Sequence, residues 1–348
     1  MEAAPHQILM DEATVRRRVT AALSGLGFAP AEIASTLTSW LYAEYSGKTG
    51  HGLERLPWLT QLVTSAKVVP AQPLTTTVNG FHTDVSGERA LGYSAADAAV
   101  SQAVRLGREK GLAVVTMAGC YPTGCMGQYT EAMVDHGLIG IAISHSPARV
   151  APYGGASAVF STTGHSFGFP SAGPVPFIYD SSVGAVTNGQ VMAAYKANAP
   201  VPAGVLSKHS AGQAERFDEV FGTNGAFDGI IALAGGDHAH KVSGWAGSLE
   251  LLMRLALLPG AEERTRQENY SIFVAIDPAW FGDAAAYRAL VSGLQASING
   301  ARPVPGAGAP QFPGERSFQS RARASRERVI SVKPGIFGQA DDDEETKP

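Results

Sequence analysis

The fold class is decided by residues 112–144, which read LAVVTMAGCYPTGCMGQYTEAMVDHGLIGIAIS. The apolar run Leu112–Met117 predicts a buried strand, and a second apolar run, Leu138–Ser144, predicts another. Between them, Met126–His136 follows a helical pattern that ends at Gly137. A strand, a helix and a second strand in succession indicate an α/β chain.

The same alternation continues on both sides of this stretch. Further strands are expected at Phe177–Asp180, Ile230–Ala234 and Ile272–Ile276. Helices are expected at Asp11–Gly25, Pro30–Tyr45, Ser94–Gly111, Val183–Asn198, Trp245–Leu257 and Asp283–Asn299. The third of these helices is expected to begin at Ser94, because Ser94 and Asp97 have the spacing of a capping box.

Two segments are expected to lie outside regular secondary structure. Residues Arg302–Gly314 are rich in proline and glycine, which rules out a helix or a central strand and predicts an extended arm lying on the body of the protein. The acidic run Asp341–Glu345 predicts a disordered C-terminal end.

Composition limits the classes of function. The 348 residues suggest two domains at about 150 residues each. A net charge of −4 offers no basic excess for a nucleic-acid backbone, so no nucleic-acid partner is expected. No apolar run approaches the ~20 residues of a membrane-spanning helix, and no secretory signal is evident. Cys120 and Cys125 cannot form a disulfide framework, so a cytoplasmic location is expected.

Several common motifs are absent or incomplete. The dinucleotide fingerprint G-x-G-x-x-G and the P-loop do not occur. Gly164–Gly168 matches the G-x-S-x-G pattern of serine hydrolases, but the glycines and prolines that follow exclude the helix that this motif requires, so Ser166 is interpreted as a loop serine and a hydrolase as a minor alternative. Neither the His238/His240 pair nor the two cysteines predict a metal site.

The segment Gly50–Arg55, GHGLER, is the clearest candidate for chemistry. Its glycines leave His51 accessible to a ligand, and Arg55 can hold a carboxylate through two parallel hydrogen bonds. Taken by itself, this segment could equally be a turn with a purely structural role. Asp180, at the end of an apolar strand, could cap the next helix or could orient a histidine and stabilise its imidazolium form.

In chain order, these segments resemble the malate/lactate dehydrogenase type 2 family, which includes sulfolactate, ureidoglycolate and piperideine-2-carboxylate enzymes. The family hallmark Ser-His-Gly-x-x-Arg corresponds to Gly50–Arg55, and its Asp-x-Ala-Thr-Ser strand end to Asp180–Gly184. Other matching segments are Pro122–Tyr129, His145–Pro147, Pro152–Gly155, Ser161–Gly164, Asn269–Pro278 and Phe312–Arg316. The similarity spans nearly all of residues 10–335.

The resemblance implies a fold other than the Rossmann domain, in agreement with the missing fingerprint. Residues 1–75 and 290–348 would form a helical dimerisation domain with a C-terminal arm, and residues 76–289 an α/β domain with a mixed sheet that binds the nucleotide. The protein would be a homodimer that uses NAD or NADP and no metal.

The resemblance also implies site residues. His51 would exchange the proton at a carbonyl or imine, which suits a side chain that titrates near neutral pH. Asp180 would set the charge of His51, and Arg55 and Thr162 would bind the carboxylate substrate. The cofactor would contact Pro122, Thr123, Gly124, Cys125, Met126, His145, Thr163, Ile178, Tyr179, Ser182, Pro313, Gly314 and Arg316.

The departures from the family pattern fall in the expected pocket. Gly50 replaces the family serine, Pro122 replaces a histidine, and the Gly-Thr-Asn-Pro loop ends in Thr163 and Gly164. An inserted stretch follows Gly235–Gly236. These changes predict a specialised reductase that acts on a 2-keto acid, a cyclic imine or a biosynthetic intermediate. The alternative is a protein of the same fold that has lost or changed its redox chemistry.

Overall fold

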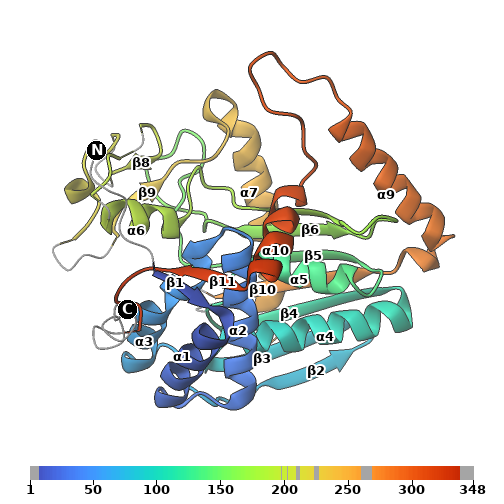
Figure 1. Cartoon of the computed structure of the whole chain (residues 1–348), viewed down its shortest axis with the longest axis horizontal. Helices are drawn as coiled ribbons and strands as arrows, with labels where there is room; N and C mark the ends of the chain where they lie inside the picture. Colours follow the sequence, from blue (N-terminus) through green and yellow to red (C-terminus); the bar gives the residue numbers. More distant parts are fainter. Residues whose placement is uncertain are drawn as a thin grey trace.

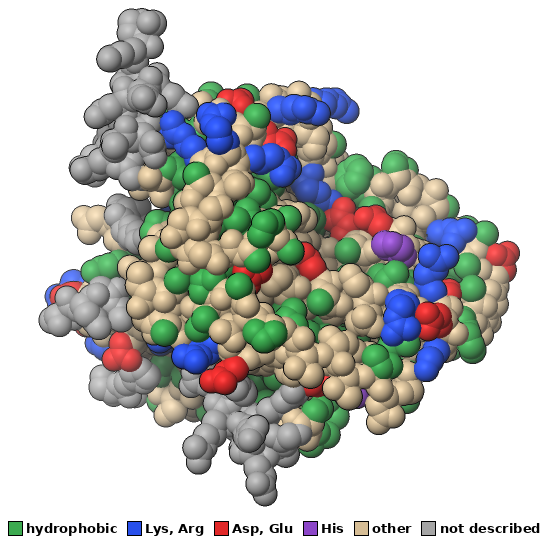
Figure 2. All heavy atoms as spheres, turned by 90° about the horizontal axis from the view of Figure 1, so that it is seen from below, with side chains coloured by type: hydrophobic (Ala, Val, Ile, Leu, Met, Phe, Trp, Pro, Cys, Tyr) green, Lys and Arg blue, Asp and Glu red, His purple; other side chains and the backbone are tan. Residues whose placement is uncertain are grey.

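The structure is a computed structural model that describes residues 8–196, 198–201, 203–208, 212–222, 227–259 and 269–337 (Figure 1). The acidic run 341–345, expected to be disordered, lies outside the described residues. Within the described ranges, no helix is long and apolar enough to cross a bilayer. On the face shown in Figure 2, apolar side chains are scattered among polar ones, and basic side chains lie next to acidic ones at several places.

A seven-stranded mixed sheet forms the centre of the molecule, with the strand order β2-β3-β4-β10-β5-β6-β7. The parallel pair is β3–β4, and the other neighbours are antiparallel. The strands are β2 (Thr75–Asn79), β3 (His82–Ala90), β4 (Leu112–Cys120), β5 (Ile139–His145), β6 (Gly164–Phe169), β7 (Phe177–Ser181) and β10 (Tyr270–Ile276).

Both faces of this sheet are buried. On β4, Ala113, Val115 and Met117 belong to one hydrophobic core, whereas Val114 and Ala118 belong to another, because successive side chains of a strand point to opposite faces. This explains why the central strands read as continuous apolar runs.

Helices cover each face. The first core contains residues of α4 (Gly92–Lys110) and α5 (Met126–Val134), and the second contains residues of α7 (Ala239–Met253) and η5 (Arg254–Leu257). The remaining elements of this region are α6 (Asn188–Lys196), η3 (Phe217–Glu219), η4 (Gly236–His238), and the short pair β8 (Leu206–Ser207) and β9 (Ile230–Ile231).

The two ends of the described chain meet in a third hydrophobic core. Strand β1 (Ile8–Asp11) pairs with β11 (Val329–Val332), which brings the first and last strands side by side. This part also contains α1 (Glu12–Gly25), α2 (Pro30–Tyr45), η1 (Thr49–His51), η2 (Leu53–Arg55), α3 (Leu56–Thr64) and α10 (Glu315–Glu327). The buried Trp40 indole donates to Tyr93 Oη over 3.0 Å and so joins α2 to α4.

Several sequence-based boundaries were wrong. Helix α4 begins at Gly92 instead of Ser94, whose hydroxyl donates to the Leu91 carbonyl; a side chain at position 92 would clash with the Pro122 carbonyl, 2.5 Å away. The expected helix 183–198 is shorter, because α6 begins at Asn188. The expected strand 230–234 is reduced to the two residues of β9, outside the main sheet. Strands β2, β3 and β6 were not anticipated.

The proline-rich segment has no helix or strand, as expected, but it does not lie along the body. Residues 302–309 are all exposed, and Figure 1 shows the connection from α9 (Ala284–Asn299) to α10 reaching away from the sheet. Only its last part packs, through the buried Phe312 stacked on Phe177. Helix α9 is continuous across position 290, so the expected boundary there cuts a helix; the division into two domains stays a prediction.

Glu44 holds the turn that carries the GHGLER segment. Its carboxylate accepts a 2.7 Å hydrogen bond from the Leu53 backbone N–H. A Cβ at position 52 would lie 2.1 Å from Glu44 Oε1, so a side chain there would displace this carboxylate. Burial of the carboxyl raises the pKa of Glu44 to about 7.

We therefore predict that Glu44→Gln changes the pH dependence of stability. Between the ordinary glutamate pKa and about 7, the folded protein binds more protons at Glu44 than the unfolded chain does. The Glu44 contribution to the unfolding free energy must then fall as the pH rises through this window. Urea titrations at pH values near both ends of this window should show that the unfolding free energy decreases less for Glu44→Gln than for the natural protein.

The matched control is Glu88→Gln, because the Glu88 side chain is 80% exposed. This variant should keep the pH dependence of the natural protein. If the unfolding free energy changed equally with pH in Glu44→Gln and Glu88→Gln, the raised pKa of Glu44 would be contradicted.

Candidate active site

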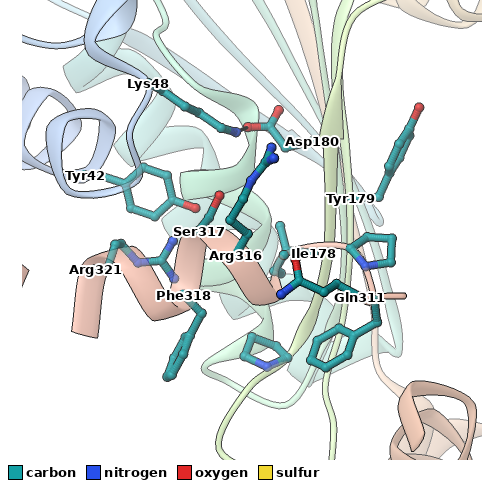
Figure 3. Close-up of a pocket in the computed structure, with 14 residues that line it drawn as sticks. Tyr42, Lys48, Ile178, Tyr179, Asp180, Gln311, Arg316, Ser317, Phe318 and Arg321 are labelled. Atoms are coloured by element: carbon teal, nitrogen blue, oxygen red, sulfur yellow. Dashed lines mark hydrogen bonds and ion pairs between the residues drawn. The ribbon is translucent and has the colours of Figure 1, made fainter. Parts of the chain in front are cut away.

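A cavity of about 340 Å³ opens between β7, the segment that leads into α10, and the end of α2 (Figure 3). It is lined by Tyr42, Lys48, Pro176, Ile178, Tyr179, Asp180, Gln311, Phe312, Pro313, Gly314, Arg316, Ser317, Phe318 and Arg321. The cavity thus joins segments from the beginning, middle and end of the chain.

Arg321 fixes one wall of this cavity. Its guanidinium donates to both carboxylate oxygens of Glu131 on α5, at 2.6 and 2.7 Å, and lies 4.6 Å from the ring centroid of Tyr42 on α2. The Tyr42 hydroxyl donates to Glu131 as well, over 3.0 Å. Because its charge is matched by Glu131, Arg321 ties α10 to α2 and α5.

Lys48 and Asp180 form an ion pair at the cavity. They are 132 positions apart in the chain, and Figure 3 shows their side chains meeting, with Arg316 pointing toward them. Burial alone would lower the pKa of the Lys48 ammonium, but the Asp180 carboxylate outweighs this effect and holds the pKa above its ordinary value.

The surroundings of His51 favour the neutral form of its imidazole. Burial, followed by the charges of Arg55 and Lys48, lowers the pKa of His51 to about 3. Its Nδ1 lies 3.5 Å from Arg55 Nη2. Arg55 in turn donates from Nε to the Gly50 carbonyl over 2.6 Å and lies 4.8 Å from the Trp58 ring centroid.

The expected contact between Asp180 and His51 is not present. The Asp180 side chain pairs with Lys48, and the charges that act on His51 come from Arg55 and Lys48. Lys48 therefore occupies the place next to Asp180 that the sequence analysis assigned to the imidazole.

Helix α6 lies against the GHGLER segment. A Cβ on Gly189 would lie 3.4 Å from the Gly50 carbonyl oxygen and 3.8 Å from Arg55 Nη2. These distances place the backbone of α6 next to that of Gly50, so α6 covers this side of the segment.

The structure divides the expected cofactor residues into two groups. The first group lines the cavity: Ile178, Tyr179, Pro313, Gly314 and Arg316. A backbone hydrogen bond from Ile178 N to Pro313 O, 3.1 Å long, holds the two segments together. Gly314 has a φ of +94°, and a Cβ there would lie 2.9 Å from the Ile178 carbonyl oxygen, so the approach requires glycine.

The second group lies away from this cavity, at the turn from β4 to α5 and at the ends of β5 and β7. Cys125 and Met126 are buried, and the Thr123 hydroxyl lies 3.1 Å from the Ser144 hydroxyl. At the end of β7, Ser182 Oγ donates to the Gly184 carbonyl over 3.4 Å. The other cofactor residues of this group are Pro122, Gly124, His145 and Thr163, and the expected substrate residue Thr162 lies in the loop before β6.

Glu250 on α7, which the sequence analysis missed, organises part of this second group. It accepts hydrogen bonds from the Ser161 backbone N–H at 3.0 Å and from the Thr163 hydroxyl at 3.0 Å, and it lies 3.2 Å from His145 Nε2. Burial raises the pKa of Glu250, but the hydrogen bond and charge of His145, with the Ser161 and Thr163 bonds, reverse the shift and lower it. A lone acid in the apolar run 245–257 was the available signal.

Thr163 is fully buried by these contacts. In this conformation its side chain shapes the 161–163 loop and does not face open space. Thr162, next to it, is partly exposed and accepts a backbone hydrogen bond from Val183 over 3.0 Å.

An aromatic cluster on the opposite side of β7 was also missed. Tyr179 points away from the Lys48–Asp180 pair (Figure 3) and lies 5.6 Å from His165, between ring centroids. His165 accepts a hydrogen bond from the Trp245 indole over 3.3 Å. Tyr179 and Trp245 remain 39% and 42% exposed, which leaves part of each ring free to stack on a planar ligand.

Ser166 is a strand residue instead of a loop residue. It lies in β6, is fully buried, and its hydroxyl is 2.7 Å from that of Thr130. A nucleophile must reach its substrate, so this position disfavours a serine hydrolase. Among the described residues, no three His, Cys, Asp or Glu side chains are grouped as metal ligands.

Relatives with assigned activities fit this arrangement. The chain is 34% identical over 184 residues to the (2R)-3-sulfolactate dehydrogenase (NADP(+)) of Chromohalobacter salexigens, covering 53% of this chain and 55% of that protein. It is 29% identical over 235 residues to a Delta(1)-pyrroline-2-carboxylate/Delta(1)-piperideine-2-carboxylate reductase of Pseudomonas aeruginosa, covering 64% and 65%. The matched stretch therefore spans less than two thirds of either relative.

A solved structure shows the same fold over the whole chain. The crystal structure of malate dehydrogenase from Entamoeba histolytica superposes with a TM-score of 0.85 at 15% identity and covers 97% of both chains. The profile of the malate/L-lactate dehydrogenase family matches residues 10–339. This chain belongs to the malate/L-lactate dehydrogenase family.

Proposed function

We propose that the protein is an NAD(P)H-dependent oxidoreductase that transfers hydride to or from the carbon next to a carboxylate. The observation that carries the proposal is the placement of Arg55 beside the neutral imidazole of His51, near a cavity that contains a lysine–aspartate pair. Family membership and the activities of the similar proteins from Chromohalobacter salexigens and Pseudomonas aeruginosa support it. The substrate would be a 2-keto acid or a cyclic imine.

The residues present fit a nicotinamide nucleotide. The positive side chain of Arg316 and the N-terminus of α10 face the cavity, and both favour the negative charge of phosphate groups. Gly314 brings the backbone of this segment against β7. When bound, the nucleotide supplies or accepts the hydride.

The substrate would be held by Arg55 and His51. The guanidinium suits a carboxylate, since its fork of donors matches the two oxygens. The neutral imidazole can donate an N–H hydrogen bond to a carbonyl oxygen or to an imine nitrogen. Helix α6 would exclude water from this pair, and Asp180 would act on the imidazole through Lys48.

The first test is binding and turnover with the natural protein. Titration with NADH and NADPH should change the nucleotide fluorescence, and addition of a 2-keto acid or Delta(1)-piperideine-2-carboxylate should oxidise the nucleotide. Both coenzymes are tried, because either fits the proposal. The absence of binding and of oxidation would favour a protein of the same fold without redox chemistry.

Arg55→Ala should weaken substrate use strongly. Loss of a charge-assisted pair in a closed site costs about 2–4 kcal/mol, which lowers kcat/KM by roughly 30- to 1,000-fold. Arg55→Lys should recover only part of this loss because the fork geometry is gone. Nucleotide affinity should stay within a few-fold in both variants.

The control for this prediction is Arg105→Ala, since Arg105 pairs with Glu109 on the exposed side of α4. It should retain the natural kcat/KM. An unaltered kcat/KM in Arg55→Ala would show that another group binds the carboxylate.

We also propose that the protein is a homodimer in the cytoplasm. Large apolar side chains are exposed on α9, where Leu290 is 73% and Leu294 is 55% exposed. They are four positions apart and therefore share one helix face. Exposed apolar patches of this kind are typical of protein interfaces.

The double variant Leu290→Glu/Leu294→Glu should shift the protein from dimer to monomer in light-scattering measurements, because charges replace the apolar face. Leu9→Glu is the control, since Leu9 is 72% exposed on β1 and should tolerate the charge without a change in mass. A natural protein that is already monomeric would refute the proposed interface.

A further inference from the structure

We propose that Lys48, held by Asp180, is the proton donor of the reaction and takes the role that the family resemblance assigns to His51. Its ammonium would give a proton to the substrate oxygen or nitrogen as hydride reaches the neighbouring carbon. This inference rests on the proposed function and names the group that completes the same site.

The position of Lys48 supports this role. The residue follows α2, and its backbone N–H donates to the Ala43 carbonyl over 2.8 Å, so its main chain is anchored. Its side chain lines the cavity, where Figure 3 shows the ammonium meeting the Asp180 carboxylate. Asp180 is anchored in β7 opposite Ser166 of β6. A lysine that is restrained at both ends presents its proton in one place.

The surroundings of His51 make it unsuited to the same task. Gly50 has no hydroxyl that could pass a proton to the imidazole. The Nδ1 atom of His51 faces the Arg55 guanidinium, which carries a permanent charge and does not release a proton. The imidazole does not line the cavity with Lys48. His51 can therefore orient the substrate, but it has no proton supply among the described residues around it.

The step balances with the nucleotide as the only redox partner. In the reductive direction, hydride adds to the carbon of the C=O or C=N bond, the electron pair of the double bond moves to the oxygen or nitrogen, and Lys48 supplies the proton. The ammonium becomes a neutral amine and regains its proton from water. In the oxidative direction the neutral amine accepts the proton.

The groups that face Lys48 determine its charge state. They are Asp180 on β7, Cys125 before α5, His51 in η1, and Arg321 and Arg316 on α10. Burial raises the pKa of the Cys125 thiol to about 12, so Asp180 is the anion of the set. Because the pKa of Lys48 is raised, the ammonium persists across neutral pH.

Two directions of the reaction should therefore respond differently to pH. With Lys48 as the donor, the reductive rate stays flat between about pH 6 and 9, while the oxidative kcat/KM rises by roughly tenfold per pH unit. A His51 donor, whose pKa is lowered to about 3, would make the reductive rate fall tenfold per unit over the same range. That fall would overturn the proposal.

Substitution separates Lys48 from the rest of the site. Lys48→Met should lower kcat by about 10²–10⁴-fold, leave nucleotide affinity within a few-fold, and abolish the oxidative pH dependence. Lys48→Arg keeps the cation beside Asp180 but cannot release a proton, so it should remain as slow as Lys48→Met. Lys67→Met, at an exposed lysine outside the site, is the control and should match the natural protein.

Chemical rescue distinguishes a proton donor from a residue that only supports the structure, because an added amine can replace a lost proton donor. In Lys48→Ala, added methylammonium should restore a saturable part of the reductive kcat, whereas tetramethylammonium, which has no proton to give, should not. His51→Gln should keep the rise of the oxidative kcat/KM with pH, even if the value of kcat/KM is lower than in the natural protein. Full activity in Lys48→Arg, or rescue by tetramethylammonium, would show that Lys48 acts only through its charge.

Failure of this inference can be told from failure of the proposed function. A natural protein that neither binds nor oxidises NADH or NADPH would refute the proposed function and this inference with it. A natural protein that turns over, with Lys48→Met equally fast, would refute only the role of Lys48.

Discussion

The candidate site depends on one interaction, the ion pair between Lys48 and Asp180. A lysine and an aspartate taken out of water are costly unless they meet. Here the lysine comes from the helical part formed by the chain ends and the aspartate from the edge strand of the sheet. Their pairing therefore links the two parts of the fold at the place where the cavity opens, and Arg321 with Glu131 makes a second link nearby.

The pocket is built by close approaches of backbone that only small residues allow. Gly314 lets the residues before α10 lie on β7, whereas a Cβ on Gly50 or Gly189, where α6 meets the His51 segment, would make ordinary contacts. A Cβ on Gly127 would lie 2.9 Å from Asp180 Oδ2, so α5 also makes room for this carboxylate. A chain with 40 glycines can hold its charged side chains in narrow spaces that larger residues would fill.

The departures from the family pattern have a shared physical consequence. Without a serine at position 50, the imidazole of His51 has only a guanidinium at its Nδ1, which favours the neutral ring. The group of the site that can give up a proton is then Lys48, whose ammonium a carboxylate stabilises. Glu44, which is partly buried, and Glu250, which is buried, accept hydrogen bonds from backbone N–H groups and hold the two loops around which this arrangement is built.

From its sequence alone, the chain could be recognised as an α/β protein of this family, because apolar runs such as 112–117 and short motifs such as GHGLER depend on neighbouring residues only. Helix α2 was predicted to the residue for the same reason, with Pro30 at its start. The partners of Asp180, Glu44 and Glu250 could not be read in this way. They depend on which segments meet in space, 132 positions apart for Lys48 and Asp180 and 89 for Ser161 and Glu250. They depend also on how much water each charge loses there, which only the tertiary structure decides.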